Sequence, residues 1–206
     1  MDREFVADAV VHVLGLVLGT LGSILLLTFS LSSSAPAQWP PFAVYVVGAM
    51  AMLGCSALHN LWRSASRRHL LRRLDHAAIF LMIAGTYTPI TTLGLADPWG
   101  TRLTVIVWSA AAVGMVVKLW QPRRVETVSV ALYLLLGWIG LIALEPLLAS
   151  MDKETLVMLL VGGVIYSGGV VFHLSDRRRY HRALWHACVL TGAAVHYLAI
   201  MTVMQA

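Results

Sequence analysis

The most informative segment of the chain is HNLWRSASRRHLLRRLDHAAIFLMIAGTYTP, residues His59 to Pro89. It contains a basic loop, and an apolar run lies on each side of that loop. Two apolar runs joined by a short loop predict a helical hairpin. Its turn places His59, which closes the first run, and Asp75, which opens the second, at nearly the same depth. Ionisable groups just inside an apolar helix are costly in lipid, so both residues are candidates for a functional site.

The composition of the chain is that of a polytopic membrane protein. Of its 206 residues, 59% are hydrophobic and 12% are charged, whereas soluble domains average about 25% charged residues. An ordinary soluble domain is therefore excluded. The two cysteines, Cys55 and Cys188, both fall inside apolar runs, so they provide no disulfide framework.

Seven runs are apolar and long enough to cross a bilayer, which takes about 20 residues. The loops between them are short, so we expect residues 1–206 to form a single domain. The sequence predicts an all-α integral membrane protein, a seven-transmembrane helix bundle. The predicted spans are Ala7–Phe29, Phe42–Trp62, Leu74–Leu95, Leu103–Trp120, Val128–Ala149, Glu154–Leu174 and Ala183–Val203.

The Lys and Arg residues gather on one side of the predicted bundle. Of the 15 in the chain, only Arg102 and Lys153 fall in loops on the other side. Short loops rich in Lys and Arg stay in the cytoplasm. We therefore expect the N-terminus to be cytoplasmic and the C-terminus to be outside. This topology explains the net charge of +5, and no nucleic-acid partner is expected.

The histidines are concentrated at the predicted cytoplasmic side, and of the 8 in the chain only His196 lies towards the outside. His69 falls in a loop and is set aside. The others lie near the inner ends of the first, second, third, sixth and seventh spans, and Asp75 shares their depth. They are His12, His59, His76, His173, His181 and His186.

A layer of imidazoles at one depth is suited to a zinc ion. Neutral imidazole is a good zinc ligand, and three protein ligands plus one water are typical of a catalytic site. Bound zinc lowers the pKa of that water towards 7 and so makes a nucleophile. Asp75 is the candidate for a catalytic role, because its carboxylate can accept the proton of the water or orient it. Its alternative role is the N-cap of the third span.

Structural roles remain open for the other members of this layer. His12, His76 and His173 suit hydrogen bonding around a site or within the fold as well as metal binding. Cys55 lies one turn before His59, where it is either a thiolate ligand or a small packing residue. His196 lies too far along its helix from His186 to share one ion with it.

Three segments carry more specific motifs: Cys55–His59 (CSALH), Leu74–Pro89 (LDHAAIFLMIAGTYTP) and Ala183–Tyr197 (ALWHACVLTGAAVHY). In order and spacing they resemble the hemolysin III family, the bacterial branch of the superfamily that contains the adiponectin and progestin receptors. Residues Glu4 to Gly15 also resemble the N-terminal motif of that family, so the resemblance covers nearly the whole chain. It implies seven spans with the N-terminus inside.

The resemblance also implies a zinc ion near the cytoplasmic side. One ligand in the family is the histidine that ends the second span, here His59. Two more come from an H-x3-H pair that opens the seventh span, and the second of these falls on His186. The first falls on Arg182. The neighbouring His181 is one residue out of register, so it can be a ligand if the helix starts after it and the chain bends there.

Two further positions complete the implied site. The aspartate that holds a water on the zinc in the family falls on Asp75. The family serine one turn before the ligand of the second span is replaced by Cys55, which could compensate as a ligand. The expected metal ligands are thus His59, His186, His181 and Asp75.

Three functions follow as hypotheses from this resemblance. The first is a role in membrane homeostasis, through lipid or energetic regulation. The alternative is a zinc-dependent hydrolase of lipid amide bonds, so enzymatic activity stays open. A pore-forming cytolysin is the third, but no amphipathic pore strand is visible. The expected location is the cytoplasmic membrane of a bacterium, with membrane lipids as partners and a homo-oligomer left open.

Overall fold

The structure is a computed structural model, and it describes residues 3–32, 38–62, 67–120, 126–175 and 178–205. These residues contain helices and no strand. The elements are α1 (Arg3–Ser32), α2 (Trp39–Leu61), α3 (Arg68–Leu93), α4 (Trp99–Trp120), α5 (Glu126–Gly137), the 3₁₀ helix η3 (Ile139–Ala143), α6 (Leu144–Ser150), α7 (Lys153–His173) and α8 (His181–Gln205).

Within the described residues, seven helical segments are long and apolar enough to cross a membrane. The all-α, seven-span prediction is therefore confirmed. The largest difference in the bounds is at α3, which begins at Arg68, about two turns before the predicted start at Leu74. Apolar composition marks the part of a helix that lies in lipid, whereas helical hydrogen bonding continues into the basic segment.

The fifth span is interrupted, because η3 separates α5 from α6. An interruption releases backbone groups that lipid cannot satisfy. The side chain of Tyr87 on α3 compensates for this. Its hydroxyl donates to the carbonyl oxygen of Gly137 (2.7 Å) and accepts from the N–H of Gly140 (3.0 Å). Tyr87 of the third span thus satisfies two backbone groups of the fifth span where that span is interrupted.

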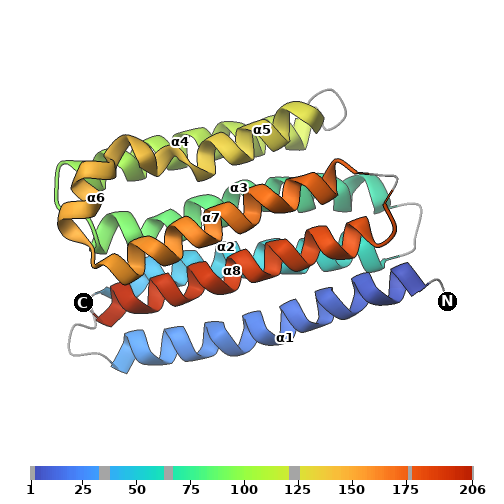
Figure 1. The fold of residues 1–206 in the computed structure, drawn as a ribbon, viewed down its shortest axis with the longest axis horizontal. Coiled ribbons are helices and arrows are strands. Elements are labelled where there is room, and N and C mark those ends of the chain that lie inside the picture. Colours follow the sequence, from blue (N-terminus) through green and yellow to red (C-terminus); the bar gives the residue numbers. More distant parts are fainter. Residues whose placement is uncertain (1–2, 33–37, 63–66, 121–125, 176–177, 206) are drawn as a thin grey trace.

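The helices form a layered bundle, shown in Figure 1. The pair α4 and α5 lies at the top of that view, α3 and α7 lie in the middle, and α1 lies at the bottom below α2 and α8. Contacts join α2 to α3, α3 to α4, α7 to α8, and α1 to both α2 and α8. The two ends of the chain lie at opposite ends of the bundle, as an odd number of spans requires (Figure 1).

The helices α2 and α3 approach each other closely through glycine. A Cβ atom added at Gly48 would lie 2.8 Å from the carbonyl oxygen of Leu81, and one added at Gly85 would lie 3.1 Å from that of Val44. Small residues allow such contacts between helix backbones in lipid. This contact places the C-terminal end of α2 beside the start of α3, and so brings His59 and Asp75 to one end of the bundle.

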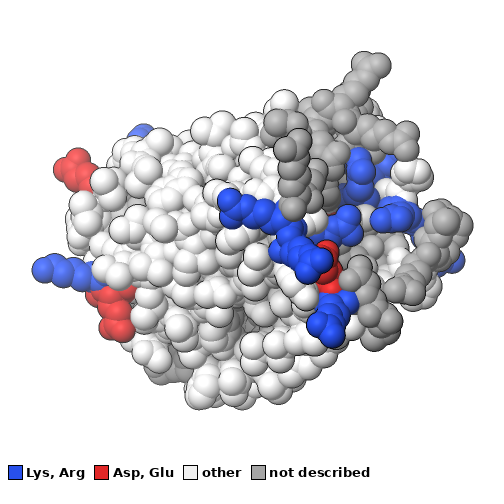
Figure 2. Space-filling model, turned by 45° about the vertical axis from the view of Figure 1, so that its right-hand side comes forward, with Lys and Arg blue, Asp and Glu red and all other residues white. Residues whose placement is uncertain are grey.

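Lys and Arg side chains gather at one end of the molecule. Figure 2 shows most of the visible Lys and Arg side chains at that end, and the apolar surface between the ends carries few charges. The basic end includes Arg72 of α3 and Arg182 of α8, which lie beside the histidines. The assignment of this end to the cytoplasm stays a prediction from the positive-inside rule.

We predict that Gly48→Ala destabilises the bundle, because the new methyl group meets the backbone of α3. The cost of overpacking is about 1–3 kcal/mol, which exceeds the gain of about 1 kcal/mol in helix propensity. Thermal unfolding of the purified protein in detergent measures the difference. The matched control is Gly54→Ala in the same helix, where an added Cβ meets nothing within 4 Å. Equal melting temperatures for both variants and the wild type would refute the close contact.

Candidate functional site

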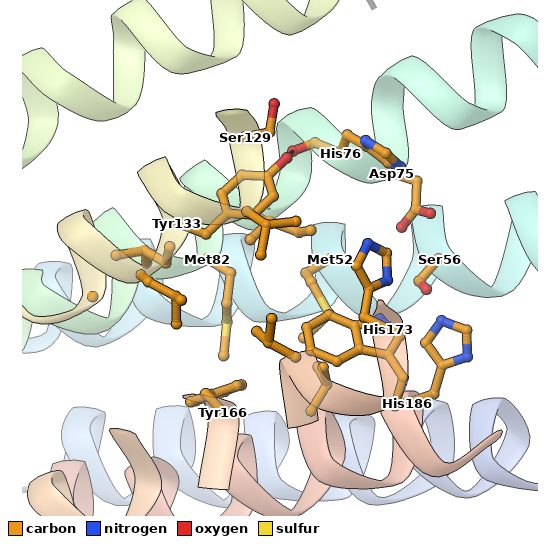
Figure 3. Close-up of a pocket in the computed structure, with 18 of the residues that line it drawn as sticks. Met52, Ser56, Asp75, His76, Met82, Ser129, Tyr133, Tyr166, His173 and His186 are labelled. Carbon is orange, nitrogen blue, oxygen red and sulfur yellow. Dashed lines mark hydrogen bonds between the residues drawn. The ribbon is translucent and has the colours of Figure 1, made fainter. Parts of the chain in front are cut away.

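A cavity of about 480 Å³ lies inside the bundle, between α2, α3, α5, α7 and α8. Figure 3 shows its two ends. Asp75, Ser56 and His186 lie at one end, whereas Met82 and Tyr166 lie towards the other (Figure 3). The cavity therefore connects a polar layer at the basic end of the bundle with an apolar interior.

The four residues that the sequence predicts as metal ligands all line this cavity: His59, Asp75, His181 and His186. They come from the last turn of α2, from α3 and from the first two turns of α8. The structure thus brings them to one compartment. The N-cap role for Asp75 is wrong, because α3 begins at Arg68 and its N-cap is Arg67.

His59 carries a nitrogen that lacks a partner. Among the described residues, its Nδ1 is buried and makes no hydrogen bond. Leaving a buried polar atom unsatisfied costs about 1–3 kcal/mol, so native proteins rarely keep one without a reason. An imidazole nitrogen without a hydrogen-bond partner, in a side chain that lines the same cavity as other histidines, is a natural ligand for a metal ion. This atom is the feature of the site that fits a metal best.

His186 makes a short hydrogen bond to an acidic residue of the first helix. Its Nδ1 lies 2.6 Å from Oδ1 of Asp8, so the ring donates to the carboxylate. Asp8 is only 6% exposed. The ring of His12 meets the ring of His186 edge to face, with centroids 4.4 Å apart. The first helix therefore forms one wall of the histidine layer.

Asp8, His12 and His186 form a group that could hold a metal ion. One potential ligand atom from each lies within 4.8 Å of the others, which no other group of three in the described residues achieves. The sequence left the role of His12 undecided between metal binding and hydrogen bonding, and it did not identify Asp8 as a candidate. The spacing did contain a signal, since residues four apart share one face of a helix.

His12 connects this group to Asp75 through a serine. Its Nδ1 donates to the backbone oxygen of Asp8 (2.8 Å), and its Nε2 lies 3.3 Å from the hydroxyl of Ser56 on α2. The carboxylate of Asp75 also forms a hydrogen bond with Ser56. Side chains of α1, α2, α3 and α8 are thus linked by polar contacts at one depth.

His181 lies on the cavity wall although it is out of register with the expected pair. The helix α8 begins at His181, and the chain bends just before it, where Tyr180 has a φ of 60°. The Nδ1 of His181 donates to the carbonyl oxygen of Arg178 (3.0 Å), which leaves Nε2 for another partner. Arg182 also lines the cavity and lies close enough to interact electrostatically with Asp8 and His59.

The remaining histidines have other contacts. His173 packs against Trp185 with ring centroids 4.9 Å apart. His196 donates from Nε2 to the carbonyl oxygen of Leu159 (3.1 Å), which fits the structural role expected for it. His76 lines the cavity. Cys55 is half-buried with a free thiol, and it is not among the described residues that line the cavity.

Imidazole nitrogens and carboxylate oxygens are the ligands that zinc takes in proteins, apart from thiolates. The donors at this end of the cavity therefore fit a zinc-like divalent ion. The fit rests on the unpartnered Nδ1 of His59 and on the cluster around His186.

The chain is similar to known proteins over almost its whole length. The model of the family "Haemolysin-III related" matches residues 3–197. The chain is 32% identical over 200 residues to the hemolysin-3 homolog of Bacillus subtilis (strain 168), and the match covers 97% of this chain and 93% of the relative. It is 31% identical over 199 residues to hemolysin-3 of Bacillus cereus, with coverages of 97% and 91%.

A more distant relative comes from a plant. The heptahelical transmembrane protein ADIPOR2 of rice (Oryza sativa subsp. japonica) is 27% identical over 186 residues, which cover 79% of this chain and 81% of the relative. Its printed name describes seven helices, the number of membrane-spanning segments found here. From the match over residues 3–197 and these relatives, the chain belongs to the haemolysin-III-related family of multi-pass membrane proteins.

Proposed function

We propose that the protein binds a membrane lipid in its central cavity, with the lipid head group beside a zinc ion, and that it acts in membrane lipid homeostasis. The observation that carries this proposal is the cavity itself. It has the histidine layer at one end and apolar walls further in. A lipid, with its polar head group and apolar chain, matches this polarity. The proposed location is the cytoplasmic membrane of a bacterium, in line with the Bacillus relatives.

The walls of the cavity suit both ends of a lipid. Its volume of about 480 Å³ lies in the range of small-molecule sites, about 300–1,000 Å³. Apolar side chains such as Ile83, Val170 and Val189 line it, and they suit an acyl chain. Arginines line the basic end, where they suit a carbonyl or phosphate group. They are Arg68, Arg72 and Arg182.

The proposed zinc ligands are His59 and His186, helped by His181, with Asp75 placed to hold a water. When bound, zinc would polarise a carbonyl group and provide a water of lowered pKa. Asp75 is only 9% exposed and is hydrogen-bonded to Ser56, so its carboxylate is held in place at the same end of the cavity.

A second candidate function is hydrolysis of an amide bond in the bound lipid. The position of Asp75 favours it, because a carboxylate within reach of a water and of a substrate carbonyl can serve as a general base. The two candidates share the cavity and the metal site, and they differ in what Asp75 does.

We predict that the purified wild type contains about one zinc ion per chain, measured by elemental analysis. His59→Ala and His186→Ala each remove a ligand and should lower the zinc content well below half. Arg182→His adds an imidazole and should retain zinc at higher chelator concentrations. His69→Ala, at an exposed position in the first turn of α3, should match the wild type. A zinc-free wild type would refute the metal site.

We predict that Val170→Trp empties the cavity of lipid, because the indole ring occupies the space of an acyl chain. Mass spectrometry of lipids that co-purify with the protein should show a loss of at least half. The matched control is Val171→Trp in the same helix, since Val171 is 54% exposed on the outer surface. Equal amounts of lipid in the two variants would show that the cavity does not bind it.

The hydrolase candidate is tested with Asp75→Asn and a fluorescent ceramide. The amide keeps the shape of the carboxylate but cannot accept a proton. We predict that turnover falls by about 10²-fold or more while zinc content and lipid binding are kept. If the wild type does not cleave ceramide, or if Asp75→Asn cleaves it at the wild-type rate, the role of Asp75 as a base is wrong.

A further inference from the structure

The contact between His186 and Asp8 joins the last helix to the first. The two residues are 178 positions apart in sequence, and their N···O distance is 2.6 Å. Their side chains are only 14% and 8% exposed, respectively. Hydrogen bonds to an ionised carboxylate are shorter and about twice as strong as neutral ones. This bond therefore fixes the orientation of the His186 ring.

The bond also determines where the ring carries its proton. The oxygen of a carboxylate accepts a hydrogen bond, so Nδ1 of His186 must hold the hydrogen. In the neutral imidazole the lone pair then lies on Nε2, across the ring from Asp8. Because His186 lines the cavity while its Nδ1 is engaged with α1, Nε2 is the nitrogen that remains for a ligand.

We propose that Asp8 is a positioning residue for the metal site: its carboxylate holds His186 in the Nδ1–H tautomer and presents Nε2 to the cavity. The inference rests on the zinc site of the proposed function. Histidines that bind metals usually donate their other N–H to a carboxylate, a carbonyl or a water, and loss of that partner costs about 10–100-fold in metal affinity.

His12 supports the same arrangement from the side. Its ring meets that of His186 at an interplanar angle of 67°, which hinders rotation of the His186 ring. Its Nδ1 donates to the backbone oxygen of Asp8, one turn earlier in α1. Two residues of the first helix thus hold the His186 ring: Asp8 accepts its hydrogen bond, and His12 limits its rotation.

The competing interpretation is that Asp8 binds the metal directly, together with His12 and His186, since one ligand atom from each lies within 4.8 Å. Two variants of the full chain separate the interpretations. Asp8→Asn keeps an oxygen that accepts from Nδ1, whereas Asp8→Ala removes the acceptor. Ser30→Ala, a buried hydroxyl at the far end of α1, controls for general damage to that helix.

The first measurement is long-range 1H–15N correlation NMR on metal-free protein with 15N-labelled histidine, and His186→Gln assigns the signals. We expect the Nδ1–H tautomer in the wild type, in Asp8→Asn and in Ser30→Ala, and a shift towards Nε2–H in Asp8→Ala. The second measurement is zinc affinity by chelator competition. We expect a loss of about 10–100-fold in Asp8→Ala, and a smaller loss in Asp8→Asn.

Three results would overturn the positioning role. One is the Nε2–H tautomer in the wild type, and another is an unchanged tautomer in Asp8→Ala. The third is an equal loss of zinc in Asp8→Asn and Asp8→Ala, which would make Asp8 a direct ligand. If the wild type binds no zinc at all, the proposed function fails, whereas the tautomer measurement still decides whether Asp8 controls the ring.

Discussion

Hydrogen bonding within a lipid-embedded bundle is the constraint on which this structure depends. Lipid offers no partners, so polar side chains inside the bundle must find them on other helices. The contacts that satisfy them also join the helices. They include His186 with Asp8 between α8 and α1, and His12 with Ser56 between α1 and α2. Trp138, the residue between α5 and η3, also bonds to Ser167 of α7. The same layer of groups thus joins the helices and lines the candidate site.

The sequence predicted much of this fold because composition and length are local properties. A run of apolar residues must span the bilayer wherever its neighbours lie, so the seven spans could be located without knowing how they pack. The depth of a residue in the membrane also follows from its position within its own span. The ends of the spans next to the basic loops contain His59, Asp75 and His186, and these residues do line one cavity.

Distances between helices could not be predicted in the same way. Asp8 lies near the start of the first span, where acidic residues are ordinary at a membrane interface. The sequence around Asp8 gives no indication that its partner is His186, 178 residues away. The bend at Tyr180 was hidden for another reason, because tyrosine has no preference for positive φ. The sequence allowed His181 as a ligand if the helix started after it and the chain bent there. In the structure α8 starts at His181 itself, directly after the bend, and His181 lies on the cavity wall.

We propose that side chains from different helices share one divalent ion at the basic end of the cavity. X-ray absorption at the zinc edge of the purified full-length protein tests it most directly. We expect nitrogen or oxygen ligands at about 2.0–2.1 Å, with the outer-shell scattering of imidazole rings. A first shell of sulfur at about 2.3 Å, or zinc surrounded by water alone, would contradict it.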